Sequence, residues 1–336
     1  MVIRRSATLL LLGLGVHLIL PQVAELQQAA QTVRDMVWWA VGLAALSQVM
    51  SYLTLANAMQ QLVQSPGQHV SLWSALGIVL AGNSIGLIAG GPVATSAAQY
   101  RWLRERGVSP TDAAVTGGII VQINNLMVAL ASLVSIAHLL THGQLTVVEL
   151  AGLVIMGLAI AATAAAFVYG RRHADGLVRG LTRMARRVAG WFHRPFDAQK
   201  LDVTVRDVLG VWDRRKEHGW AKPLLAAFLS MFFDMLTLFA LFTAARNPVG
   251  FGTLLVGYGL PLLLGKLTFL PGGVGIIEAS MARLYGSLGV PHEVLVIVVL
   301  AYRLVSFWVP NTLGFVLAPV MTHRGQRHRV RASVRP

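Results

Sequence analysis

The sequence comprises 336 residues, of which 55% are hydrophobic and 12% are charged. A soluble domain has about 25% charged residues, so this composition indicates an integral membrane protein. The 28 Lys and Arg residues outnumber the 14 Asp and Glu residues, an excess that favours anionic lipid surfaces or anionic substrates. The basic residues lie beside apolar runs and not on a compact domain, which argues against a nucleic-acid partner. The chain has no cysteine, which excludes disulfide frameworks and cysteine metal sites.

Apolar runs near the roughly 20 residues that a spanning helix requires follow one another along the chain. We expect membrane helices at residues 36–59, 72–90, 113–137, 147–169, 223–245, 249–270 and 294–318. A shorter run follows Arg4 and Arg5. It resembles the apolar core of a signal peptide, but no clear small-residue cleavage site closes it, so we expect a retained first helix. These runs predict an all-α, polytopic integral membrane protein.

Residues 171–222 form a long polar segment between the two apolar halves. Apolar residues recur there at steps of three and four while arginines occupy the other faces, which predicts an amphipathic helix. The apolar positions are Leu177, Leu181, Met184, Val188 and Trp191. Such a helix can lie on a membrane surface with its arginines among lipid phosphates, or it can be a solvated linker helix.

The two apolar halves contain related segments. When the sequence is displaced by 182 residues, six identical residues align without a gap within positions 90–108. They are Gly90, Gly91, Ala97, Arg101, Gly107 and Val108, which fall on Gly272, Gly273, Ala279, Arg283, Gly289 and Val290. In both copies an apolar run breaks at a diglycine, and a Gly-Val turn then leads into another apolar run. Paired broken segments of this kind mark the binding site of many transporters.

The distribution of arginines predicts the orientation. Short cytoplasmic segments carry an excess of Lys and Arg, which places the start of the chain, the linker and the basic tail in the cytoplasm. We expect the membrane to be the inner membrane of a bacterium. Single spans would give five crossings before the linker and three after it, whereas both numbers must be even. The parity is restored if each diglycine segment folds back to the side from which it entered. We therefore expect an inverted repeat with two re-entrant, broken-helix hairpins, near 72–106 and 251–288, that open to opposite sides.

This reading divides the chain into five parts. They are an N-terminal helix with a short external segment (1–35), a first membrane repeat (36–170), the basic cytoplasmic linker (171–222), a second membrane repeat (223–320) and a basic cytoplasmic tail (321–336).

Ionisable residues inside the apolar runs indicate a site. Asp234, Lys266 and Arg303 each lie within such a run, where a charged side chain that faces lipid costs at least about 2.5–3.5 kcal/mol. We expect them to contact substrate, or to form a buried pair, such as Asp234 with Lys266 or Arg303, that only holds helices together. A helix that begins at Gly272 or Gly273 would direct free N–H groups and its positive dipole end toward a phosphate or carboxylate.

The predicted substrate-binding residues gather at both glycine breaks and in the apolar runs beside them. They are Asn83, Gly90, Gly91, Arg101, Asp234, Lys266, Gly272, Gly273, Gly275, Glu278, Arg283 and Arg303. The amides between Gln122 and Asn125 have a weaker case, because amides commonly bridge helices. We expect no catalytic residue, no metal site and no cofactor, since the histidines lack metal-ligand spacing and the segment GKL at 265–267 lacks the rest of a phosphate-binding loop.

The segment LPGGVGIIEASMARLYGSLGVP, followed by LAYRLVSFWVPNTLGFVLA, resembles the signature of the flippase-like membrane domain of lysylphosphatidylglycerol synthases and stand-alone prokaryotic proteins. The matching positions are Pro271, Gly272, Gly273, Gly275, Glu278, Gly289 and Arg303. The first half departs from this pattern. Ala89 stands where a proline is usual, and Thr95 and Ser96 stand where an acidic residue is expected.

The resemblance implies a lipid translocase that moves a lipid between leaflets through a cavity lined by the two hairpins. Anionic phospholipids, polyprenyl-phosphate lipids and hopanoid-related lipids are the candidate cargo, and a lipid-biosynthesis enzyme is a candidate partner. A transporter or channel for a smaller solute, an intramembrane lipid-modifying enzyme and an assembly partner are the alternatives. In the fused synthases aminoacyl transfer resides in a separate soluble domain, which the residues after 322 are too few to form, so we expect no enzymatic activity. The sequence does not indicate an oligomeric state.

Overall fold

The computed structural model describes residues 34–63, 69–89, 91–141, 219–268 and 270–333, with residues 169, 175–176, 179–180 and 182–183 of the central segment. Every regular element in this part of the chain is helical, which confirms the predicted all-α class. Five of the described helices are long and apolar enough to cross a membrane: Trp38–Leu62, Leu72–Ala89, Pro110–Leu139, Ala221–Ala244 and His292–Met321. The expected first helix, the expected span at 147–169 apart from its last residue, and the apolar positions of the amphipathic helix lie outside the described residues.

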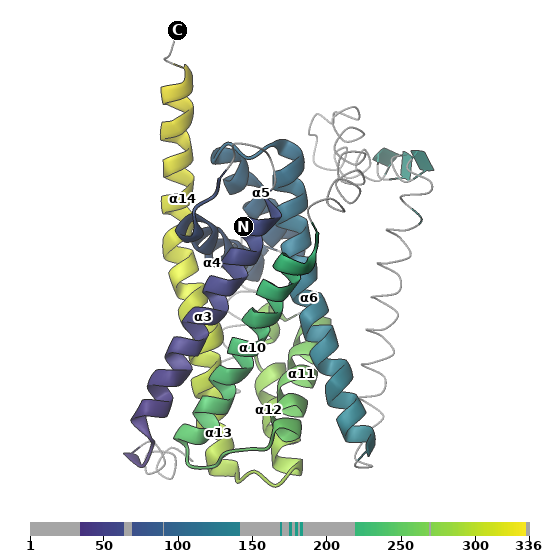
Figure 1. The fold of residues 1–336 in the computed structure, drawn as a ribbon, viewed down its shortest axis with the longest axis vertical. Helices are drawn as coiled ribbons and strands as arrows, with labels where there is room; N and C mark the ends of the chain where they lie inside the picture. The colour runs from purple at the N-terminus through teal and green to yellow at the C-terminus, as the bar shows by residue number, and fades with distance from the viewer. Residues whose placement is uncertain are drawn as a thin grey trace, which may run out of the picture.

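The helices form two successive sets (Figure 1). The first set is α3 (Trp38–Leu62), α4 (Leu72–Ala89), α5 (Pro92–Glu105) and α6 (Pro110–Thr141). The second set is α10 (Ala221–Ala244), α11 (Phe251–Leu267), the 3₁₀ turn η1 (Pro271–Gly273), α12 (Ile276–Ser287) and α13 (His292–Arg303), which continues through the π-helical turn η2 (Leu304–Trp308) into α14 (Val309–Ser333).

The displacement of 182 residues relates the helices as well as the glycines. Applied to the first residues of α3, α4, α5 and α6, it gives positions 220, 254, 274 and 292, within three residues of the starts of α10, α11, α12 and α13. The repeated Gly-Val turns also have one structure. Gly107 and Gly289 adopt φ angles of 85° and 86°, and the following valine N–H donates to a carbonyl five residues earlier at 3.2 and 3.1 Å. Both turns therefore end their helices with the same left-handed glycine cap.

Both broken segments are antiparallel hairpins. In the first, Gly86 of α4 lies against Thr95 of α5, close to the break. In the second, Gly265 of α11 lies against Ile277 of α12, and the Tyr285 hydroxyl donates to the carbonyl of Leu254 at 3.0 Å. The returning helices α5 and α12 have 14 and 12 residues, or about 21 and 18 Å, whereas the 24 residues of α10 span about 36 Å. Both chain reversals thus lie near the middle of the bundle.

The two sets meet along α3 and α10, which run antiparallel. The Ser51 and Ser230 hydroxyl oxygens lie 3.2 Å apart, and Thr237 Oγ1 donates to the carbonyl of Ala44 at 3.4 Å. Small and hydroxyl-bearing side chains let these backbones approach closely, as is usual where membrane helices pack together. Opposite directions for corresponding helices are what an inverted repeat requires.

Each hairpin packs against the last helix of the other set. On α4, Ser84 Oγ donates to the carbonyl of Asn311 in α14 at 2.8 Å. On α6, Ser132 and Ser135 donate to the carbonyls of Gly259 and Leu255 in α11 at 2.8 and 2.7 Å. The two halves are therefore interlocked and do not form two separable bundles.

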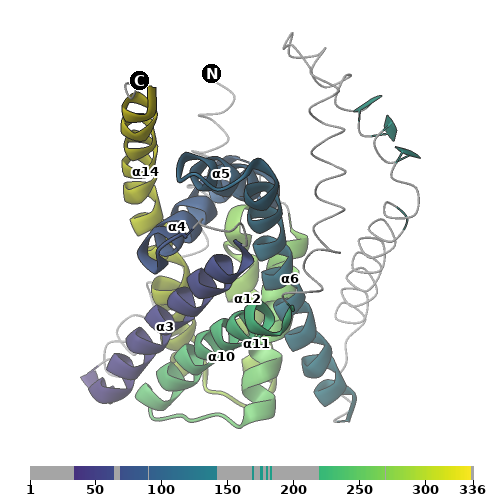
Figure 2. The same ribbon diagram turned by 45° about the horizontal axis from the view of Figure 1, so that its top comes forward.

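The hairpins open at opposite ends of the molecule (Figures 1 and 2). We call the end where α5 leads into α6 the upper end and the end where α10 leads into α11 the lower end, as they stand in Figure 1. The outward side chains include exposed Phe228, Phe232, Leu130 and Val316, the apolar surface that lipid tails require. Each hairpin thus returns to the end of the molecule from which it entered, as an even number of crossings in each half requires. The re-entrant position of the hairpins in a bilayer and the cytoplasmic location of the upper end stay predictions.

The predicted topology can be tested because the chain has no cysteine. Single cysteines at Lys222, exposed at the upper end, and at Ser287, exposed at the end of α12, should be labelled by a membrane-impermeant thiol reagent from opposite sides. We expect Ser287→Cys to be labelled in intact cells and Lys222→Cys only after the membrane is opened. Labelling of both from one side would contradict the inverted hairpins, and the reverse pattern would contradict the orientation.

Candidate functional site

The break in the second half is built from glycines in left-handed conformations. Gly272, Gly273 and Gly275 have φ angles of 65°, 63° and 86°, which glycine alone adopts at little cost. A Cβ atom at Gly272 would also overlap the ring of Phe307. Because positive φ angles do not belong to a right-handed helix, α12 begins only at Ile276. The expectation that the helix begins at Gly272 or Gly273 is wrong.

The N–H groups expected to await an anion at this break have partners within the chain. The Gly273 N–H donates to the carbonyl of Leu270 at 3.0 Å. The Gly275 N–H donates to Glu278 Oε2 at 2.7 Å. Glu278 therefore places its own carboxylate at the positive end of α12, where a bound anion would otherwise be stabilised.

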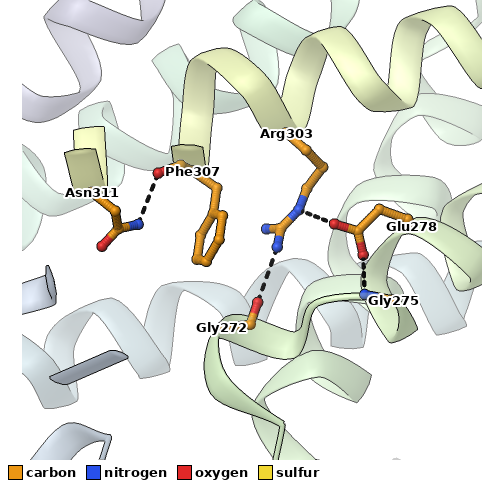
Figure 3. A network of polar contacts seen from close by, with 6 residues as sticks. All are labelled: Gly272, Gly275, Glu278, Arg303, Phe307 and Asn311. Atoms are coloured by element: carbon orange, nitrogen blue, oxygen red, sulfur yellow. Dashed lines mark hydrogen bonds and ion pairs between the residues drawn. The ribbon is translucent and has the colours of Figure 1, made fainter. Parts of the chain in front are cut away.

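Arg303 connects this break to the opposite helix (Figure 3). Its Nε donates to Glu278 Oε1 at 2.6 Å, and its Nη2 donates to the carbonyl of Gly272 at 3.1 Å. Its guanidinium carbon lies 4.1 Å from the centre of the Phe307 ring. The side chains of Arg303 and Glu278 are only 4% and 17% exposed, so this charge-assisted pair is shielded from water. One arginine thus joins α13, α12 and the broken backbone.

Asp234 belongs to a different set of contacts. Its Oδ2 accepts hydrogen bonds from the hydroxyls of Tyr258 at 2.9 Å and Tyr302 at 2.8 Å. The expected pairing of Asp234 with Lys266 or Arg303 is wrong, because the acidic partner of Arg303 is Glu278. Asp234 points from α10 toward the tyrosines of α11 and α13, and Arg303 projects one position further around α13.

Lys266 lies at the end of α11, beside the break. Its Nζ donates to Asn125 Oδ1 of α6 at 2.7 Å, and the residue is exposed. No carboxylate of the described residues forms an ion pair with it. Lys266 therefore lies at the bundle surface and uses one of its three N–H donors for Asn125.

The break in the first half lacks these charges. Gly90 lies outside the described residues, and Gly91, with a φ angle of 68°, accepts from the N–H of Thr95 at 3.0 Å. The positions that correspond to Glu278 and Arg303 hold Ser96 and Val121. The departure seen in the sequence therefore removes the ion pair from the first break.

Three predicted residues lie apart from the Arg303 network. Arg101 is exposed on α5 and pairs with Glu105 at 3.0 Å, while Arg283 is exposed on α12 and Asn83 is half-buried on α4. In the described part of the chain, no group of three or more His, Asp and Glu side chains is placed to hold a metal ion.

Sequence reasoning missed four contributors to these networks. Tyr258 and Tyr302 bind Asp234. In Figure 3, Phe307 covers Arg303, and the Asn311 amide donates to the carbonyl of Phe307 at 2.8 Å. The two tyrosines carried a usable signal, since a hydroxyl inside an apolar run requires a partner. Phe307 and Asn311 carried none, because η2 determines where they point.

The Glu278–Arg303 pair should behave as one unit in unfolding experiments on the purified protein in detergent. Arg303→Met leaves the Glu278 carboxylate partly buried without its cation and should lower the free energy of unfolding by about 3–5 kcal/mol. The double variant Glu278→Gln, Arg303→Met should lose clearly less than the sum of the two single variants. Additive losses would show that the pair does not couple α12 to α13.

Comparisons with known proteins agree with this architecture. The family model described as the lysylphosphatidylglycerol synthase TM region matches residues 7–314. A UPF0104 membrane protein of Methanothermobacter thermautotrophicus is 33% identical over 94 residues, or 28% of each chain. A UPF0104 membrane protein of Methanocaldococcus jannaschii is 26% identical over 144 residues, which cover 42% of this chain and 43% of the relative. The matches thus span less than half the length of these relatives. Since the family model covers most of the sequence, the chain belongs to the lysylphosphatidylglycerol synthase transmembrane-region family.

Proposed function

We propose that the protein is a lipid translocase of the inner membrane that moves an anionic phospholipid or a polyprenyl-phosphate-type lipid between leaflets. The observation that carries the proposal is the pair of glycine-broken hairpins that open at opposite ends, each packed on the last helix of the other half. Inverted repeats with broken helices are the usual architecture for alternating access to a central site. Membership in the lysylphosphatidylglycerol synthase transmembrane-region family supports a lipid as the cargo.

The second break supports passage of a polar headgroup. Irregular backbone inside a bilayer is tolerated where protein satisfies it or where it lines a polar cavity. Arg303 and Glu278 satisfy the backbone of the break at Gly272 and Gly275. A headgroup can therefore approach the break without exposing unsatisfied peptide groups to lipid.

Lys266 is the proposed first contact for an anionic headgroup. It is exposed beside the break, lies on the hairpin and is bonded to the amide of Asn125 and not to a carboxylate. Arg303 is less available, because Glu278 and the carbonyl of Gly272 occupy its donors. We assign Arg303 first to positioning the break and second to contact with the headgroup once the ion pair loosens.

Replacement of Lys266 should slow lipid movement without unfolding the protein. A hydrogen bond to a charged group is worth about 1.5–3 kcal/mol, so Lys266→Gln should reduce the initial rate at least about tenfold at a low lipid fraction. The assay is leaflet-specific detection of a labelled anionic lipid in proteoliposomes. Lys222→Gln, an exposed lysine at the start of α10, serves as the matched control. Equal rates for Lys266→Gln and the wild type would refute this site, and movement of a small solute but of no lipid would favour a solute transporter.

We expect the driving force to be electrochemical, because the sequence carries no nucleotide-binding motif. A potential that is negative inside favours outward movement of an anion by about 2.3 kcal/mol per charge per 100 mV. A potassium–valinomycin potential, negative on the cytoplasmic side, should therefore accelerate outward movement of an anionic lipid in vesicles that contain no ATP. A zwitterionic lipid is the control and should respond much less. Strict dependence on added ATP would contradict this mechanism.

A further inference from the structure

Asp234 lies near the middle of α10, at the centre of the contact between the two halves. Ser51 faces Ser230 at 3.2 Å and Ala44 faces Thr237 at 3.4 Å. On α3, Gln48 lies between Ala44 and Ser51. On α10, Asp234 lies between Ser230 and Thr237. The antiparallel register therefore places Gln48 within one residue of the level of Asp234, and the Gln48 amide is within reach of the Asp234 carboxyl.

The hydrogen bonds of this cluster leave one acceptor without a donor. Asp234 Oδ2 accepts from both Tyr258 and Tyr302, whose residues are 2% and 1% exposed. Gln48 is 4% exposed, and its Oε1 is buried without a hydrogen-bond partner. A buried acceptor of this kind costs about 1–3 kcal/mol. One additional hydrogen atom on the carboxyl would supply the missing donor if the amide turned so that Oε1 faced the acid.

The charges of the cluster also leave one negative charge in excess. From α3, Asp234 is faced by Gln48 and by Tyr52, whose hydroxyl donates to the carbonyl of Ser306 at 3.0 Å. From α11 it is faced by Tyr258, and from α13 by Tyr302 and Arg303. The titratable groups of α6, which also packs against α10, are Asp112 and His138 near its two ends.

Arg303 does not cancel the charge of Asp234, because it is paired with Glu278 at 2.6 Å. Two carboxylates and one guanidinium give this region a formal charge of −1 when all are ionised. An uncompensated carboxylate inside a bilayer is costly, which favours a neutral cluster, while the hydrogen bonds from Tyr258, Tyr302 and Gln48 offset part of that cost.

We propose that Asp234 and Gln48 form a proton-binding site at the interface of the two halves. The proton resides on Oδ1 of Asp234 and is donated to Gln48 Oε1 once the amide turns about its Cγ–Cδ bond. Oδ2, then the carbonyl oxygen of the acid, keeps its bonds from Tyr258 and Tyr302. The proton comes from water, and Asp234 is half-buried and not fully enclosed by protein. No other covalent bond is made or broken, and the turn of the amide moves the Gln48 N–H₂ group away from the carboxyl.

A proton fits the cluster better than a metal cation. A sodium ion that has shed its water needs several oxygen ligands, whereas Asp234 brings a single carboxylate. The hydroxyls of Tyr258 and Tyr302 already direct their hydrogens at it. A proton needs one donor atom and one acceptor, and the cluster offers both.

The proton-binding site adds a coupling ion to the proposed translocase. Only the coupling between proton and lipid rests on that proposed function. An anionic headgroup that enters beside Lys266 and Arg303 adds negative charge near the cluster and strengthens proton binding. By reciprocity the proton strengthens headgroup binding by the same factor. We infer that proton and lipid bind together, which lets a pH gradient drive the lipid.

Infrared spectroscopy of the full chain in lipid nanodiscs tests the site without any measurement of transport. In phosphatidylcholine nanodiscs at neutral pH, with choline as the only added cation, the wild type should show the C=O band of a protonated carboxyl group. Asp234→Asn should lose this band and Glu278→Gln should keep it. Tyr302→Phe should shift the band to higher frequency, since the carbonyl loses one donor, while the buried Tyr285→Phe, whose hydroxyl bonds to Leu254 instead, should leave it in place.

Each other outcome overturns a defined part of the proposal. Absence of the band in the wild type, or its survival in Asp234→Asn, would refute proton binding at Asp234. If Asp234→Asn does not fold, an unshifted band in Tyr302→Phe refutes the assignment. Loss of the band when sodium replaces choline at constant pH would indicate a sodium site.

The link to lipid is tested separately by exchanging phosphatidylcholine for phosphatidylglycerol, which should preserve the band to higher pH. No change on this exchange would refute the coupling. A protonated Asp234 in a protein that moves no lipid would leave the site standing and refute the translocase. Lipid movement without the band would refute the proton site and leave the proposed translocase standing.

Discussion

A helix that breaks inside an apolar bundle leaves carbonyl and N–H groups that neither water nor lipid can satisfy. In the second half of this protein the Arg303–Glu278 pair meets that requirement. Arg303 bonds to the carbonyl of Gly272, and Glu278 bonds to the N–H of Gly275. The arginine could not be buried without its carboxylate, and the carboxylate could not approach the backbone so closely if the glycines carried side chains. The conformation of the break, the position of α13 and the charge balance at the break thus depend on one ion pair.

The interlocking of the two halves connects the second break to the helices of the first half. The hairpin that carries the second break packs through α11 onto α6 of the first half, where Ser132 and Ser135 bond to its carbonyls. The first hairpin packs in the same way onto α14, through Ser84. These contacts couple each hairpin to the last helix of the other half, which offers the proposed translocase a physical route for opening its two ends in alternation.

The two halves share a backbone plan but differ in chemistry. Gly91 and Gly273 correspond in position and have φ angles of 68° and 63°, yet only the second break is accompanied by a buried ion pair in the described residues. The exposed Lys266 and the carboxyl of Asp234 also belong to the second half. The repeat supplies the symmetry that the proposed alternating access requires, while the departures from it concentrate charge where a headgroup is proposed to bind.

Composition and hydrophobic run length were sufficient to predict an all-α membrane protein and most of its spans, because burial in lipid demands long apolar helices whatever their neighbours are. Crossing parity and the repeat predicted two hairpins, since both follow from the order of residues along the chain. The partners of the buried charges did not follow from that order. Asp234, Lys266 and Arg303 were equally plausible partners in the sequence, and rotation of α10 toward two tyrosines, the π-helical turn after Arg303 and the left-handed glycines before Glu278 decided among them. Pairing across helices depends on their rotation and depth, which only the packed tertiary structure determines.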